Sequence, residues 1–104
     1  MDMTGRALAG TIVEAAPLEG ARRAAYRLVI DFGADVGTRT SSAQLTDLYR
    51  AEDLIGRQVV ALVDLEPKRI AGFESQVLVL GLPSPGGVVL LAPDRSVADG
   101  AEVF

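Results

Sequence analysis

Hydrophobic and polar residues alternate along much of this 104-residue chain, and a period of two predicts β-strands. The clearest case is residues 25–33, AYRLVIDFG, where one face carries the four larger apolar side chains Tyr26, Leu28, Ile30 and Phe32. Alternate residues of a strand point to opposite faces of the sheet. We therefore expect a half-buried strand here that ends at Gly33.

Strand-like segments recur on both sides of this one, and turn residues separate them. They cover residues 7–15 (ALAGTIVEA), 34–45 (ADVGTRTSSAQL), 57–65 (RQVVALVDL), 74–82 (ESQVLVLGL), 88–93 (VVLLAP) and, as a terminal edge strand, part of 96–104 (SVADGAEVF). Gly10, inside the first of them, marks a bend or a close approach of another part of the chain. The next segment after residues 34–45, TDLYRAEDLIG, is the only one with helical spacing, which runs from the preceding Leu45 to Leu48 and Tyr49. This segment is too short to be a stable helix alone.

This order of elements predicts an all-β fold with a small α content. A closed five-stranded barrel of the OB-fold type, with one short helix between the third and fourth strands, fits it well. A chain of 104 residues has the size of one domain, so we expect residues 1–104 to form a single domain.

Two strands are apolar on both faces, although a small barrel has only one interior. The second faces include Val60 and Leu62 in one strand and Val89 and Leu91 in the other. One short helix cannot cover them all, so a homodimer is expected. We predict that the terminal stretches, residues 4–8 and 98–104, pack at the dimer interface, because terminal strands left alone would fray.

Composition excludes several kinds of chemistry. The chain has no cysteine and no histidine, which removes disulfides, thiolate metal sites and the usual general base. The serines therefore lack an activating partner and the carboxylates are scattered, so we expect no catalysis, no metal and no cofactor. The apolar stretches are too short to span a membrane, and the first residues do not resemble a secretory signal, which favours a cytoplasmic protein.

The formal net charge of −4 provides no general attraction for nucleic acid. Binding of a polyanion would need a local basic patch. The candidate is the sequence EPKRIAG, in which the only lysine, Lys68, is next to Arg69. Pro67 ends one strand and Gly72 allows the turn into the next. The pair is therefore either part of a solvated turn or the rim of a binding site.

Other candidate ligand contacts are polar groups near this turn. Within TSSAQ, Ser41 and Ser42 can cap the helix or, with Gln44, bind a peptide backbone or a sugar-phosphate. Ser75 and Gln76 begin the next predicted strand, and Phe73 either packs inward or contacts a ligand. Arg39 adds a further cation to a basic rim.

Two long segments resemble one known family. Residues 27–49, RLVIDFGADVGTRTSSAQLTDLY, and residues 54–81, LIGRQVVALVDLEPKRIAGFESQVLVLG, are similar to the CsaA family of export-related chaperones. That family lies within the EMAP-II-like group of tRNA-binding domains, and the resemblance extends over nearly the whole chain. The run Asn-Phe-Pro-Pro that usually precedes the basic pair is replaced here by Asp64, Leu65, Glu66 and Pro67.

The resemblance implies a dimeric OB-fold protein that binds unfolded or exported polypeptides, with the basic turn beside the ligand surface. Related members bind tRNA by its shape, so a tRNA-binding protein is the alternative. An assembly domain whose partner is another folded protein is a third possibility.

Overall fold

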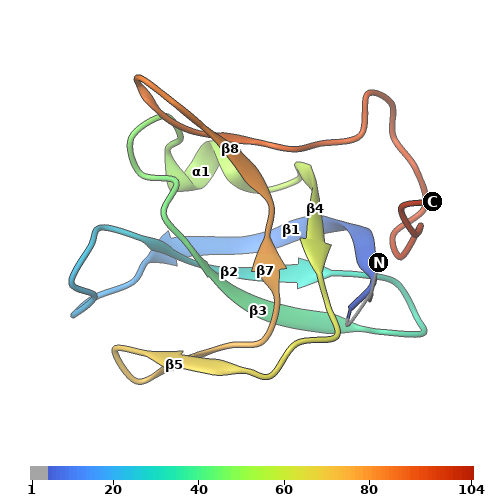
Figure 1. The fold of residues 1–104 in the computed structure, drawn as a ribbon, viewed down its shortest axis with the longest axis horizontal. Helices are drawn as coiled ribbons and strands as arrows, with labels where there is room; N and C mark the ends of the chain where they lie inside the picture. The colour runs from blue at the N-terminus through green and yellow to red at the C-terminus, as the bar shows by residue number, and fades with distance from the viewer. Residues whose placement is uncertain (1–4) are drawn as a thin grey trace.

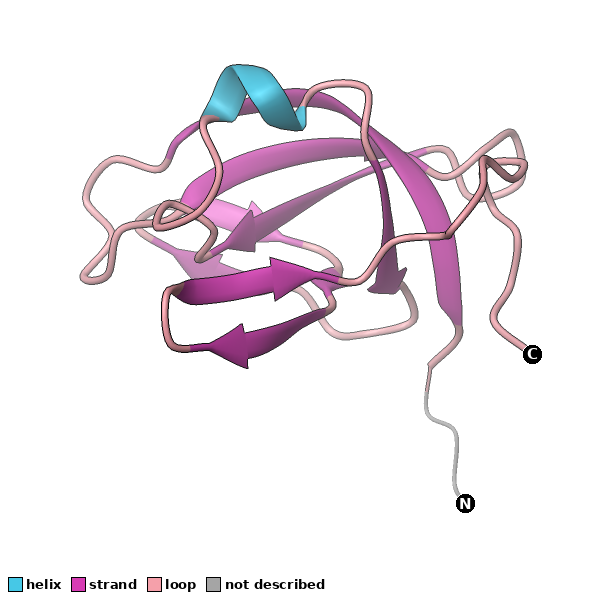
Figure 2. Cartoon of the chain, turned by 90° about the horizontal axis from the view of Figure 1, so that it is seen from above, coloured by secondary structure: helices cyan, strands magenta, loops and turns pink. Residues whose placement is uncertain are grey.

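The computed structural model describes residues 5–104, and its main element is a curved antiparallel sheet of five strands in the order β3-β2-β1-β4-β7 (Figure 1). Two small hairpins, β5-β6 and β8-β9, complete it. The elements are β1 (Ala7–Pro17), β2 (Tyr26–Asp31), β3 (Thr38–Ala43), α1 (Ala51–Leu54), β4 (Gln58–Leu62), β5 (Lys68–Ile70), β6 (Phe73–Ser75), β7 (Leu78–Val79), β8 (Gly81–Ser84) and β9 (Gly87–Leu90). The predicted all-β, OB-fold-type barrel with one short helix is confirmed. Seen from above, its strands curve around a common interior (Figure 2).

The core is aliphatic, and the alternation in β2 builds much of it. Tyr26, Leu28, Ile30 and Phe32 are all buried, as their period of two predicts. Gly10 of β1 lies directly against two of these side chains. A Cβ atom at that position would lie 2.7 Å from Phe32 Cδ1 and 2.8 Å from Ile30 Cγ2. Glycine is therefore required at this position for space, which confirms the predicted close approach.

The barrel is closed between β3 and β6-β7 by backbone and side-chain hydrogen bonds together. Gln76 N and Val77 N donate to Thr40 O at 2.8 and 3.1 Å, and Thr40 N donates in return to Gln76 Oε1 at 3.0 Å. Ser42 N donates to Ser75 Oγ at 2.9 Å. These bonds satisfy backbone groups at the edge of β3 that a ladder would otherwise pair.

The predicted helix is present but has a single turn, α1, and the two serines do not cap it. Its N-cap is Arg50, which makes no capping bond, and both Ser41 and Ser42 lie in β3. The helix-capping role considered for these serines is therefore wrong. The preceding Tyr49 is the better anchor: its carbonyl oxygen accepts from Tyr26 Oη at 2.7 Å, and its own Oη accepts from Leu90 N at 3.0 Å. This residue ties hairpin β8-β9 to the barrel.

Residues 74–82 do not form the single strand that the sequence predicts. The segment is divided among the ends of β6, β7 and the start of β8, because each part pairs with a different partner. Leu78 and Val79 pair with β4, while Gly81–Ser84 pair with β9. Residues 77–82 (VLVLGL) are apolar without interruption, which conceals the change of partner from β4 to β9.

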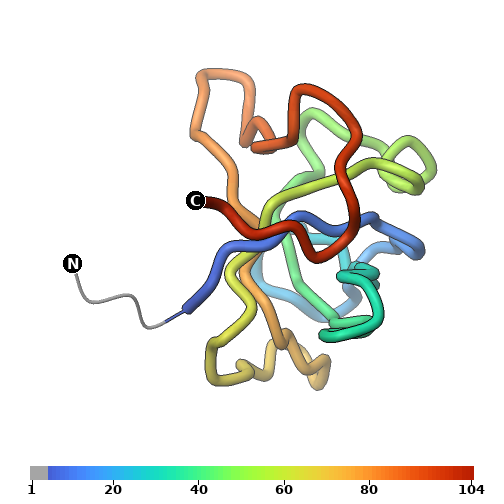
Figure 3. The backbone as a smooth tube through the Cα atoms, turned by 90° about the vertical axis from the view of Figure 1, so that its right-hand side faces the viewer, coloured from blue at the N-terminus to red at the C-terminus, as the bar shows by residue number. Residues whose placement is uncertain are grey.

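The C-terminal segment lies along β1 of the same chain. Ala9 N donates to Ala101 O, and Gly100 N and Val103 N donate to Ala9 O and Ala7 O, all at 2.8–2.9 Å. Figure 3 shows the end of the chain crossing the first strand. The segment 98–104 therefore covers an edge of its own barrel, and its part in a dimer stays a prediction. Of the N-terminal stretch 4–8, residue 4 lies outside the described residues.

Side chains hold this segment in place as well. Gln58 Nε2 donates to Val97 O at 2.7 Å and to Asp99 Oδ1 at 3.2 Å, and Gln58 Oε1 accepts from Val97 N at 3.0 Å. Thr11 Oγ1 donates to the same Asp99 oxygen at 2.6 Å. We call Thr11, Gln58, Val97 and Asp99 the C-terminal clamp.

Within residues 5–104, no helix has the length and apolar character needed to cross a membrane.

Candidate ligand-binding groove

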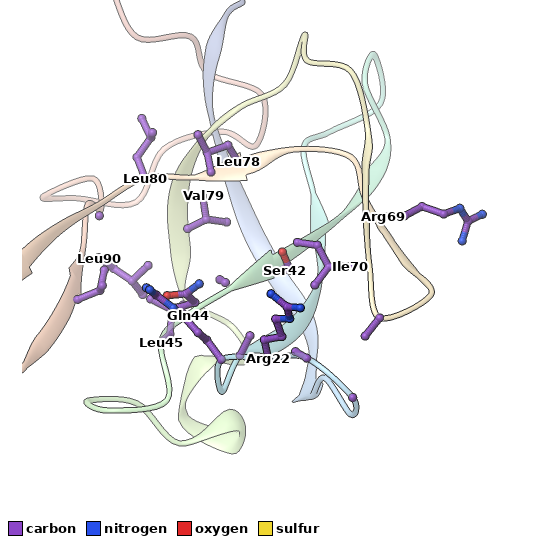
Figure 4. Close-up of a pocket in the computed structure, with 18 residues that line it drawn as sticks. Arg22, Ser42, Gln44, Leu45, Arg69, Ile70, Leu78, Val79, Leu80 and Leu90 are labelled. Atoms are coloured by element: carbon purple, nitrogen blue, oxygen red, sulfur yellow. The ribbon is translucent and has the colours of Figure 1, made fainter.

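An open groove of about 680 Å³ lies where the β1-β2 loop, the end of β3 and hairpin β5-β6 meet strands β7 to β9 (Figure 4). We refer to it as the groove. Its lining is mostly apolar or small, and its residues are Gly20, Ala21, Arg22, Arg23, Ala25, Ser42, Ala43, Gln44, Leu45, Arg69, Ile70, Ala71, Leu78, Val79, Leu80, Gly81, Val88 and Leu90.

The apolar part of the groove lies between strand β7 of the barrel and hairpin β8-β9. Leu78, Val79 and Leu80 come from the segment that leaves β4, and Leu90 comes from β9. Leu78 is exposed to solvent over 49% of its surface. Exposed aliphatic surface in a concave site is typical of ligand pockets.

The charged part of the groove is basic only. Arg22, Arg23 and Arg69 are the charged residues among its lining, and no carboxylate lines it. This contrasts with the whole chain, which has 14 acidic and 10 basic residues. Among residues 5–104, none of these three arginines is in an ion pair. Sequence reasoning did not find Arg22 and Arg23; their adjacency in a loop was the available signal.

Hairpin β5-β6 carries the basic pair that the sequence singled out. Its two-residue turn has positive φ at Ala71 (52°) and Gly72 (80°), the conformation of a tight hairpin turn. Lys68 is exposed and does not line the groove. Arg69 lines it, but its Nη1 donates to Gly72 O at 2.9 Å, and in Figure 4 the side chain extends away from the other lining residues.

The other predicted contacts are distributed over several places. Ser42 and Gln44 line the groove, whereas Ser41 is fully buried in the barrel and is therefore inaccessible to a ligand. Ser75 and Gln76 close the barrel through the bonds described above. Their polar groups have structural roles that the sequence did not predict.

Phe73 and Arg39 lie outside the groove. Phe73 is half-buried beside Arg27 in a shallow hollow on the far side of hairpin β5-β6, rather than in the core. Arg39 donates from Nη1 to Thr38 O at 3.0 Å. The expected basic rim of Arg39, Lys68 and Arg69 is thus not assembled in the groove.

The strongest electrostatic pair also lies elsewhere. Arg6 Nε and Nη2 donate to the two carboxylate oxygens of Asp64 at 2.8 and 3.1 Å, linking the start of β1 to the chain after β4. The hydrogen bonds from Arg6 lower the pKa of Asp64 to about 2, and the carboxylate raises the pKa of Arg6. Among residues 5–104, no group of three or more acidic residues is arranged to hold a metal ion.

These features define a class of protein. The barrel has the OB-fold architecture, and the groove lies between the β1-β2 loop and hairpin β5-β6, which connects β4 to β7. In OB-folds the corresponding two loops border the ligand site. The chain is therefore an OB-fold binding domain.

Its family follows from comparison with known proteins: residues 8–102 match the family described as "Putative tRNA binding domain", and the chain belongs to this family. The methionine--tRNA ligase of Methanothrix thermoacetophila is 37% identical over 94 residues, which are 90% of this chain and 14% of the ligase. That of Pyrococcus furiosus is 40% identical over 75% of this chain and 10% of the ligase. The chain thus spans only a small part of these curated relatives.

Two solved structures cover almost the full chain. The chaperone CsaA from Bacillus anthracis has a TM-score of 0.89 and 48% identity, over 97% of this chain and 92% of that one. The CsaA chaperone protein from Picrophilus torridus has a TM-score of 0.91 and 39% identity, over 96% and 92%. The resemblance to CsaA within the tRNA-binding domain group is confirmed. The family is one of tRNA-binding and chaperone domains rather than catalytic ones, although the ligases that contain such domains are enzymes.

Proposed function

We propose that this protein is a non-catalytic, CsaA-like chaperone that binds unfolded or export-bound polypeptides in the groove. The observation that carries this proposal is the partly exposed aliphatic surface of the groove, formed by Leu78, Val79, Leu80 and Leu90, of which Leu78 is the most exposed. An unfolded segment exposes apolar side chains and backbone groups together. The aliphatic wall suits the former, and Ser42 and Gln44 suit the latter.

The similarity to CsaA supports the same reading because it extends over nearly all of both chains. By contrast, the ligase relatives share only one module with this chain. We place the protein in the cytoplasm, where such clients are synthesised.

We propose a homodimer as the working unit. Several large apolar residues outside the groove are exposed, first along hairpin β8-β9 and then in the C-terminal segment: Leu82, Val89, Leu91, Val97, Val103 and Phe104. Exposed apolar surface of this kind is typical of protein interfaces, and a two-fold partner covers it with an identical surface.

Suppression of client aggregation tests the proposal, with two leucines of similar exposure as a matched pair. Leu78 lines the groove and is 49% exposed, whereas Leu48 lies outside it and is 46% exposed. The unmodified protein should protect a chemically denatured client, Leu78→Gln should protect it less, and Leu48→Gln should behave like the unmodified protein. Absence of protection and of peptide binding by calorimetry at high protein concentration contradicts the proposal.

A structure-specific tRNA-binding protein is the second candidate, favoured by the family match and by the arginines of the groove. Binding through phosphate contacts weakens steeply as salt rises. A gel shift with bulk tRNA at low and moderate salt tests it. The candidate fails if no complex forms at low salt, or if Arg22→Glu with Arg23→Glu leaves the binding unchanged.

A further inference from the structure

We infer that the groove selects acidic apolar segments, in which aliphatic side chains are flanked by Asp or Glu. This inference rests on the proposed polypeptide-binding function and names its substrate class. The evidence is the charge of the groove: three arginines and no carboxylate among its lining residues, in a chain whose net charge is −4. A ligand that enters the groove meets cations beside the aliphatic wall and no acidic lining residue.

Arg22 and Arg23 carry the selection. Both are exposed on the β1-β2 loop, and neither is in an ion pair within residues 5–104. In Figure 4 the Arg22 side chain points into the groove, towards Ser42 and Ile70. A guanidinium group in this position offers two parallel N–H donors to a carboxylate.

Arg69 contributes less, because its side chain is restrained by a hydrogen bond and is turned away from the groove. Its Nη1 donates to Gly72 O at 2.9 Å, and its register partner across the hairpin is Glu74. Its side chain also extends away from the groove in Figure 4. The chain thus provides an internal contrast between two free arginines and one restrained arginine that line the same groove.

The geometry suits an extended segment. The aliphatic wall of Leu78, Val79 and Leu90 takes the apolar side chains, and successive residues of an extended chain advance by about 3.3 Å. The loop that carries Arg22 and Arg23 borders the same groove, so we expect a carboxylate that flanks the apolar residues to pair with one of these arginines. Lysine or arginine at that place would put like charges together and weaken binding.

The test uses three short blocked peptides that share the core Leu-Val-Leu. They differ only in the residue that flanks this core on each side, which is Glu, Gln or Lys. Titration calorimetry or fluorescence anisotropy measures each dissociation constant with the full-length protein. We expect the Glu peptide to bind most tightly and the Lys peptide most weakly. An exposed arginine–carboxylate pair strengthens binding by roughly 1.4- to 5-fold, so two pairs give a preference for Glu over Gln of roughly 2- to 25-fold.

Variants assign the effect to residues. Arg22→Gln with Arg23→Gln should remove the preference for Glu over Gln, and Arg69→Gln should reduce it less. Arg95→Gln is the charge-matched control, because Arg95 is 92% exposed in its side chain and does not line the groove. Raising the salt concentration should narrow the preference, since exposed pairs are screened.

The possible outcomes separate this inference from the proposed function. Equal binding of the three peptides overturns the selectivity and leaves the chaperone function standing, whereas absence of binding of all three overturns both. A preference for Glu that survives the double variant overturns the assignment to Arg22 and Arg23. Displacement of the Glu peptide by bulk tRNA at a lower concentration than by unlabelled Glu peptide identifies a phosphate site and overturns the inference.

Discussion

The C-terminal clamp offers a prediction whose size follows from counted hydrogen bonds. Replacing Gln58 by alanine removes two donated bonds, to Val97 O and Asp99 Oδ1, and one accepted from Val97 N. Net contributions are about 0.5–1.5 kcal/mol for each bond, and two of these three are exposed, so we expect a loss of about 2 kcal/mol. For a domain of this size that lowers Tm by roughly 8–16 °C.

Thermal and denaturant unfolding measure the loss, and hydrogen exchange locates it. The amides of Ala9, Gly100 and Val103 join the C-terminal segment to β1, and they should exchange faster in Gln58→Ala. Gln44→Ala is the matched control, because that glutamine is exposed and its replacement should change stability by no more than about 0.5 kcal/mol. Unchanged stability and unchanged exchange in Gln58→Ala would refute the clamp as the element that holds the segment.

Three further predictions concern the core, the Arg6–Asp64 pair and the dimer. Gly10→Ala should destabilise the barrel by about 1–3 kcal/mol in denaturant unfolding because the added methyl group overlaps core side chains, whereas Gly5→Ala, whose Cβ has ordinary contacts, should not. The pKa of Asp64 is lowered from 3.8 to about 2, so the stability that comes from its pairing with Arg6 is complete above pH 3.8 and is lost as the pH falls towards 2. Asp64→Asn should therefore flatten the dependence of stability on pH between these two values. An unchanged pH dependence in this variant would count against the pair. Leu82→Gln, at an exposed hairpin position, should shift a dimer towards monomer in light scattering, and a dimer that persists in this variant places the interface elsewhere.

Much of the barrel follows from local pattern. The faces of β2 are fixed by alternation, because one face packs in the core and the other meets solvent. Gly10 is recognisable as a close approach because glycine is unfavourable in a strand interior without a packing reason. The sequence therefore predicts a strand reliably where one whole face of the strand is buried and the other is exposed to solvent.

Other features depend on long-range partners that a local pattern does not reveal. Residues 77–82 (VLVLGL) are apolar throughout, so nothing in them marks where β7 leaves β4 and β8 begins to pair with β9. From the sequence, Ser75 and Gln76 are candidate ligand contacts, because polar groups near a turn usually face solvent. Their actual bonds are to β3, more than 30 residues earlier in the chain.

The groove was predicted only in part for the same reason. Ser42, Gln44 and Arg69 were identified from one stretch of sequence on each side of α1. Arg22 and Arg23 come from a third stretch, and only the folded barrel brings their loop to the edge of the same groove.

NMR chemical-shift perturbation tests whether an unfolded polypeptide binds in the groove. Isotope-labelled protein would be titrated with the Glu-flanked peptide and, separately, with a permanently unfolded client. We expect the largest shifts to fall on groove residues, notably Ser42, Leu78, Val79 and Leu90, and Leu78→Gln to weaken them. Shifts confined to residues outside the groove, or no shifts at saturating ligand, would contradict binding in the groove.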